Sequence, residues 1–121
     1  HDYYDEFIEK IVDKKDYLYT ISYAYALLSY KESNIFKALF MSDLAGSRTI
    51  EEVLNSSWNV GTIESIPKQY GIDKNQAREL YRDVRFYTHG LSCQIATKSI
   101  IITEEEIQNL IKNIIMKVSD E

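Results

Sequence analysis

Residues that interrupt or cross-link a chain are scarce in this 121-residue sequence, which contains one proline, four glycines and one cysteine. Because a sheet protein needs many turn residues, their scarcity favours long helices and an all-α fold. The single cysteine, Cys93, cannot form an internal disulfide, which fits a reducing compartment. The apolar runs, such as residues 100–102, fall far short of the roughly 20 residues that a bilayer span requires. We therefore expect a soluble, cytoplasmic protein with no membrane segment.

Basic side chains are outnumbered, because 14 lysines and arginines stand against 19 aspartates and glutamates, for a net charge of -5. Non-specific affinity for nucleic acid comes mainly from clustered basic side chains, so we do not expect this segment to bind DNA by itself. The two histidines and one cysteine lack the spacing of a zinc site, and no glycine-rich loop is present to cradle a phosphate. We expect no metal and no cofactor.

The chain length fits one domain, because 121 residues can form a single hydrophobic core but not two independent ones. We therefore expect residues 1–121 to be one domain. The sequence begins with His1 rather than methionine, and on that basis we expect a fragment or trimmed form of a longer protein.

Helical periodicity is the main pattern in the sequence. Apolar residues recur at three- and four-residue steps, the spacing that places side chains on one helical face. This pattern predicts six or seven helices, the first over residues 2–14 and the longest over residues 73–97. Three helices are expected to begin at a capping box, in which two residues satisfy each other's backbone donors. These boxes are Thr49 with Glu52, Asp73 with Gln76, and Thr103 with Glu106.

Single residues predict the other helix ends. Asp16 can cap a helix that runs to about Lys31, and Ser33 or Asn34 can cap the next one, which should end near Gly46. These residues favour helix termini because their side chains or their backbone freedom satisfy the unpaired backbone groups there.

Gly61 and Pro67 are expected to divide or kink the helical stretch that follows Thr49. Proline removes one backbone hydrogen bond and clashes with the preceding turn, so two shorter helices or one bent helix should result. Gly71 should then terminate this stretch.

Four side chains follow one another at four-residue steps on the longest predicted helix, namely Tyr81, Arg85, His89 and Cys93. This spacing forms a polar stripe beside the apolar seam. Arg85 can bind an anionic group, and Tyr81 and His89 can orient polar atoms of a ligand in an apolar cavity. The alternative is that Arg85 pairs with an acidic neighbour and that His89 is a structural histidine at a helix crossing.

Large apolar side chains suited to line such a cavity are Phe36, Phe40, Met41 and Trp58. The alternative is that they are ordinary core residues. Gly90 costs about 1 kcal/mol relative to alanine inside a helix. Its presence beside His89 suggests that another helix or an effector approaches closely there, and we expect a helix.

An enzyme is not expected. Cys93 and His89 lie one helical turn apart, like a thiolate and its base, but no third group that would orient the histidine is evident. A mid-helix cysteine of this kind is far more often an inert core residue. The acidic run at residues 104–106 fits the favourable charge at a helix N-terminus better than acid–base catalysis.

Two stretches resemble the C-terminal domain of TetR-family transcription regulators. The run Tyr-Thr-His-Gly-Leu-Ser at residues 87–92, followed by Ile-Thr-Glu-Glu-Glu-Ile at 102–107, is similar to that family's last two helices. The run Glu-Ser-Asn-Ile-Phe-Lys-Ala-Leu-Phe at residues 32–40, after Tyr30, is similar to the family's region in which an aromatic residue precedes Glu-Asn-Pro and an aliphatic-aromatic helix. Here Ile35 stands in place of the proline.

The resemblance implies a TetR-like C-terminal helical bundle that encloses an unknown small-molecule effector and forms a homodimer through its last two helices. It also implies that DNA is contacted only through an N-terminal helix-turn-helix domain that is missing from this chain, in a regulator that we expect to be a repressor. Residues 2–14 are expected to transmit the effector signal. The candidate effector-binding residues are Phe36, Phe40, Met41, Trp58, Tyr81, Arg85 and His89.

The last predicted helix carries an apolar stripe wider than one neighbouring helix usually covers. Together with the resemblance, this stripe predicts that two copies pack through their last two helices. The candidate dimer residues are Tyr87, Leu91, Gln94, Ile107, Leu110, Ile111, Ile114 and Ile115. The alternative is that the domain's own core takes up this face. A second possible function is an all-helical protein-interaction module without an effector.

Overall fold

The computed structural model describes residues 16–41 and 48–119, and these residues form six α-helices and no strand. The expected all-α fold is therefore confirmed for this part of the chain. The helices are α2 (Tyr17–Lys31), α3 (Ser33–Phe40), α4 (Ile50–Leu54), α5 (Ser57–Tyr70), α6 (Lys74–Ala96) and α7 (Glu104–Ser119). The helix expected over residues 2–14 lies outside the described residues.

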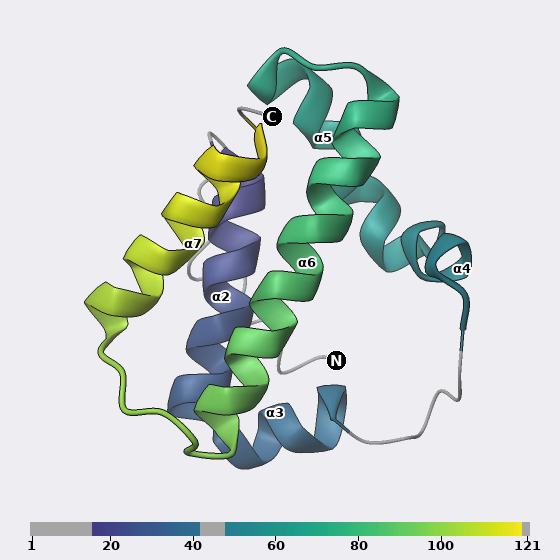
Figure 1. Cartoon of the computed structure of the whole chain (residues 1–121). Coiled ribbons are helices and arrows are strands. Elements are labelled where there is room, and N and C mark those ends of the chain that lie inside the picture. The colour runs from purple at the N-terminus through teal and green to yellow at the C-terminus, as the bar shows by residue number, and fades with distance from the viewer. Residues whose placement is uncertain (1–15, 42–47, 120–121) are drawn as a thin grey trace.

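Three long helices form the centre of the molecule. Figure 1 shows α2, α6 and α7 packed side by side, with α2 in contact with both of the others. The short helix α3 crosses one end of this bundle, and α5 packs against α6 and α2. None of the described helices combines the length and the apolarity that crossing a bilayer requires.

The core is built from aliphatic side chains that recur at helical spacing. Each such side chain stabilises the fold by roughly 1.5–3 kcal/mol when it is fully removed from water. The larger aliphatic residues with no exposed surface are Leu18, Leu28, Ile66, Val84, Ile107 and Ile111. All of them except Leu28 belong to one apolar cluster that joins the central bundle to α5, whereas Leu28 lies in a second cluster with Phe36 of α3.

All three predicted capping boxes are present. Thr49 with Glu52 starts α4, and Asp73 with Gln76 starts α6. At the start of α7, the N–H of Glu106 donates to Thr103 Oγ1 at 3.1 Å, and the Glu106 carboxylate accepts from the Thr103 N–H at 3.0 Å. The predicted cap of α2 is also confirmed, because Asp16 accepts a hydrogen bond from the backbone N–H of Tyr19.

The prediction that Ser33 or Asn34 caps the next helix is wrong, because Ser33 is already helical. Glu32 is the single residue between α2 and α3. Its N–H donates to the backbone oxygen of Leu28 at 2.7 Å, and its own backbone oxygen accepts from the N–H of Phe36 at 2.9 Å. One residue therefore ends one helix and begins the next. The predicted end near Gly46 lies outside the described residues.

The helical stretch after the first capping box is divided, but at residues 55–56 rather than at Gly61 or Pro67. The side-chain amide of Asn59 explains this position, because it donates to the backbone oxygen of Val53 at 2.8 Å. This bond joins the two helices across the corner. Gly61 lies within α5, which continues without interruption.

Pro67 lies in the last part of α5, where the loss of one backbone hydrogen bond leaves little helix to disturb. Gly71 ends the helix as predicted. Its φ of 67° is left-handed, a conformation that costs a residue with a Cβ more than it costs glycine, and its N–H donates to the backbone oxygen of Pro67 at 2.9 Å.

Candidate functional site

Side chains from α4, from α6 and from the residue Arg48 line an open hollow of about 210 Å³. The three residues from α6 lie at three- and four-residue steps, so they share one face of that helix. The lining residues are Arg48, Ile50, Val53, Leu54, Arg82, Arg85 and Phe86. This site is called the Arg85 hollow below.

Arg85 lines this hollow without an acidic partner among the described residues. Its guanidinium lies near the hydroxyl of Tyr81 and lowers the pKa of that hydroxyl, against the effect of burial. Arg82 differs, because its Nε donates to Asp83 Oδ1 at 2.8 Å. Within the described residues, the alternative that Arg85 pairs with an acidic neighbour gains no support.

Tyr81 connects the Arg85 hollow to α5. This side chain is buried, and its hydroxyl donates to Oδ1 of the buried Asn59. Burial raises the pKa of Tyr81, while the nearby Arg85 guanidinium opposes the rise. Because Asn59 also donates to the backbone oxygen of Val53, hydrogen bonds run from Tyr81 through Asn59 to the opposite wall of the hollow.

His89 lies one helical turn beyond Arg85, and both of its ring nitrogens have partners. The hydroxyl of Tyr25 is 2.5 Å from Nδ1, and Cys93 Sγ is 3.3 Å from Nε2. A neutral imidazole fits two such partners, because one nitrogen donates and the other accepts. Burial lowers the pKa of His89, and the Arg85 guanidinium lowers it further. His89 thus joins α2 to α6 at their crossing.

The aromatic candidates from α3 pack against Tyr25 rather than around the Arg85 hollow. The ring centroid of Tyr25 is 5.0 Å from that of Phe36 and 4.8 Å from that of Phe40. Phe36 has no exposed surface, so the core alternative holds for this residue. Of the remaining candidates, Met41 is 40% exposed just after α3, and the side chain of Trp58 lies outside the described residues.

The Cys93 and His89 pair has the third group that seemed to be missing from the sequence, because Tyr25 orients the imidazole. The prediction that no such group exists is wrong, since Tyr25 comes from a distant helix. Burial nevertheless raises the pKa of the Cys93 thiol, and a neutral thiol is a poor nucleophile. Within the described ranges, no three His, Cys, Asp or Glu side chains are grouped where they could hold a metal ion.

Of the residues that line the Arg85 hollow, only Arg85 was predicted from the sequence. Arg82 and Phe86 had a usable signal, because they share a face of the longest predicted helix with Arg85. Val53 and Leu54 had none, since only the turn of the chain between α4 and α5 brings them to that face.

The dimer candidates on α7 divide into two sets. Ile107, Ile111 and Ile115 are buried in the core of the single chain. Their prediction as contacts to a second copy is wrong, because side chains already covered by α2 and α6 have no surface left for a partner. Leu110 and Ile114 are only half-buried and lie along the edge of this buried stripe.

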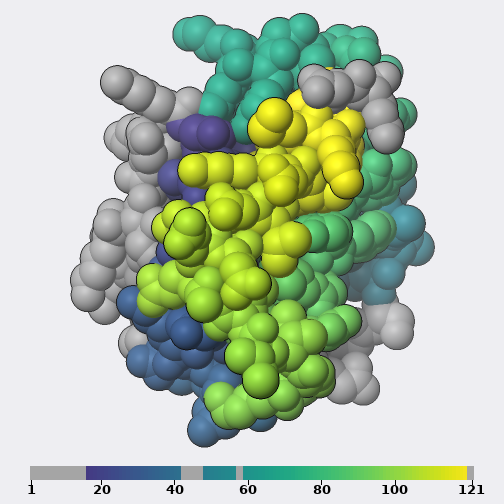
Figure 2. Space-filling view, turned by 60° about the vertical axis from the view of Figure 1, so that its left-hand side comes forward, coloured from purple at the N-terminus to yellow at the C-terminus, as the bar shows by residue number. Residues whose placement is uncertain are grey.

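The dimer candidates on α6 remain accessible. Tyr87 is 37% exposed, Gln94 is exposed and Leu91 is half-buried. In Figure 2 the outer side of α7 faces the viewer, with α6 beside it. Tyr87, Leu91, Gln94, Leu110 and Ile114 are called the α6–α7 face below.

Gly90 is exposed on α6 between Tyr87 and Gln94. A Cβ built on Gly90 would meet no atom within 4 Å. No helix in the described part of this chain approaches Gly90 closely, so the expected close contact is not made among these residues. Without a side chain at Gly90, a helix from outside this chain could approach the backbone of α6 closely there.

Comparison of the chain with protein-family models, with curated proteins and with solved structures finds no match.

Proposed function

We propose that this chain is the ligand-sensing and homodimerisation domain of a TetR-like transcription regulator that acts as a repressor. The observation that carries the proposal is that one helix, α6, takes part in two different surfaces. One flank of α6 lines the Arg85 hollow, and another carries the exposed residues Tyr87 and Gln94. A ligand that shifts α6 would therefore act on both.

The Arg85 hollow is the proposed effector site. Its walls come from α4 and α6, and the hydrogen bonds from Tyr81 to Asn59 and from Asn59 to Val53 connect these walls through α5. An effector changes the protein only if it binds one arrangement of the walls better than another. In the proposed regulator, such a change would pass through residues 2–14 to an N-terminal helix-turn-helix domain and alter its binding to DNA.

The α6–α7 face is the proposed dimer contact. Two copies related by a two-fold axis would bring their α6 and α7 helices together as a four-helix arrangement. Tyrosine is enriched among the residues that dominate protein interfaces, and the exposed Tyr87 would lie near the centre of this contact. The exposed Gly90 would allow the helices to approach closely.

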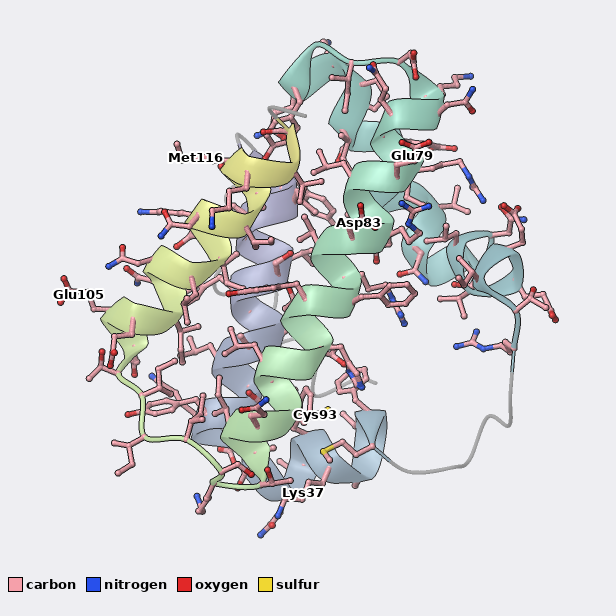
Figure 3. The ribbon with its side chains drawn as sticks, in the orientation of Figure 1. Lys37, Glu79, Asp83, Cys93, Glu105 and Met116 are labelled. Carbon is pink, nitrogen blue, oxygen red and sulfur yellow. The ribbon has the colours of Figure 1, made fainter. Side chains whose placement is uncertain are left out.

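The dimer is tested by sedimentation velocity of the wild type, Tyr87→Glu and Met116→Glu. Met116 is the matched control, because it lies on α7, is 61% exposed and points away from the bundle (Figure 3). We expect Tyr87→Glu to raise the dimer dissociation constant at least about tenfold, since losing an interface aromatic costs more than about 1.4 kcal/mol. Met116→Glu should leave it unchanged. A wild type that stays monomeric at every concentration would contradict the proposal.

One observation favours the second function, a helical interaction module without an effector. The rings of Tyr25, Phe36 and Phe40 pack against one another and fill the space between α2 and α3. Native mass spectrometry of the purified chain separates the two functions. A small molecule retained by the folded dimer supports a sensor, whereas a dimer that carries no added mass and binds no probe supports the module.

A further inference from the structure

We propose that the Arg85 hollow binds a small organic anion, with a carboxylate held by Arg85 and an apolar body held by α4 and Phe86. The inference rests on the proposed function and deepens it by naming the chemical class of the effector. Its basis is the combination of an arginine without an acidic partner, an apolar wall and a restricted volume in one place.

The charge of the hollow is unusual for this chain, whose net charge is -5. Three of its lining residues are arginines. Asp83 forms an ion pair with Arg82. Arg85 has no such partner in the described ranges. A ligand carboxylate would supply one.

Arg85 lies beside the buried Tyr81, whose hydroxyl donates to Asn59. A guanidinium presents several N–H groups in one plane, which suit a two-pronged contact with a carboxylate.

The rest of the wall is apolar. Ile50 is 52% exposed and Phe86 is 50% exposed, although both are large hydrophobic residues. Together with Val53 and Leu54 they line the same hollow as the arginine side chains. An apolar ligand body would cover this surface and exclude water, which strengthens the charge interaction at Arg85.

The volume limits the size of the ligand. The hollow holds about 210 Å³, and a cavity of about 150 Å³ is large enough to bind benzene. Drug-sized ligands occupy pockets of roughly 300–1,000 Å³. One ring or one short aliphatic chain attached to a carboxylate therefore fits.

A second hollow in the molecule lacks these features. It measures about 290 Å³ and includes Arg78. This arginine already donates to Glu51 at 3.1 Å and to Asn55 at 3.1 Å. Its charge is thus satisfied within the chain, which makes Arg78 the matched control for Arg85.

The test is isothermal titration of the 121-residue chain with benzoate, with hexanoate and with the neutral isostere benzamide. We expect the wild type to bind benzoate or hexanoate, and to bind benzamide at least about tenfold more weakly, as the loss of a charge-assisted hydrogen bond predicts. Arg85→Gln should weaken benzoate binding by a similar factor. Arg78→Gln should leave it unchanged. Circular dichroism confirms that each variant is folded.

Arg85→Lys keeps the charge and serves if Arg85→Gln does not fold. It should bind benzoate less tightly than the wild type but better than benzamide. Equal binding of benzoate and benzamide, an equal loss in Arg78→Gln, or no binding of either anion would overturn the inference. If native mass spectrometry shows a retained neutral molecule and no anion binds, the proposal of an anionic effector is overturned, while the proposal of a ligand-sensing domain is supported. Anion binding by a chain that remains monomeric would support the site and overturn the dimer.

Discussion

His89 shows how burial and a neighbouring charge act on one side chain. Its ring is bonded to Tyr25 and Cys93, and burial together with the Arg85 guanidinium lowers its pKa below the ordinary value of 6.5. In the unfolded chain the same histidine takes up a proton near 6.5. The folded state therefore binds fewer protons than the unfolded state once the pH falls below that value. The stability associated with His89 is complete above 6.5 and is lost as the pH falls toward its lowered pKa.

We expect His89→Gln to reduce this pH dependence. Between about pH 7.5 and about pH 5.5, the free energy of unfolding should fall more in the wild type than in the variant. Urea unfolding followed by circular dichroism measures both. Met116→Gln is the control, because Met116 is an exposed residue of α7 that carries no titratable group, so this variant should keep the wild-type slope. Parallel pH profiles for the wild type and His89→Gln would show that the pKa of His89 is not lowered.

At the scale of the helices, replacing either of two glycines by alanine should change the free energy of unfolding in opposite directions, although both have open space around them. A Cβ at Gly61 or at Gly71 would meet no atom within 4 Å. Gly61 lies inside α5, so Gly61→Ala should raise the free energy of unfolding by up to about 1 kcal/mol. Gly71 has a φ of 67°, so Gly71→Ala should lower it by about 1–2 kcal/mol. Thermal or urea unfolding gives both values, and a change of the same sign in both variants would refute the explanation.

Helix starts were predictable from the sequence where their signal is local. The capping boxes at Thr49, Asp73 and Thr103 each depend on a partner three residues away, so no knowledge of the fold is needed. The two missed corners have a different cause. Glu32 caps both helices with its backbone N–H and oxygen alone. The side-chain amide of Asn59, in α5, donates to the backbone oxygen of Val53 in the preceding helix. Neither arrangement leaves a pattern of residue types.

At the scale of the whole molecule, the candidate site was predictable only in part. The stripe of Tyr81, Arg85 and His89 was visible because one helix carries all three. The sequence did not show that Tyr81 and His89 belong to different hydrogen-bonded groups. That division depends on partners from other helices, because Asn59 binds Tyr81 and Tyr25 binds His89. The same limit applies to α7. Its buried and half-buried isoleucines lie within one helical turn of each other, so the spacing alone does not show which of them the core covers.

The wild-type unfolding temperature should rise with protein concentration if two copies associate through the α6–α7 face. Association stabilises the folded chain by mass action, because the unfolded chain has no such face to offer a partner. Tyr87→Glu removes an exposed aromatic ring without disturbing the core, so its unfolding temperature should depend less on concentration and match the wild type in dilute solution. Differential scanning calorimetry over a wide concentration range measures this dependence. A wild-type unfolding temperature that does not vary with concentration would mean that two copies do not associate. Burial of Ile107, Ile111 and Ile115 within the single chain would then account for the apolar stripe of α7.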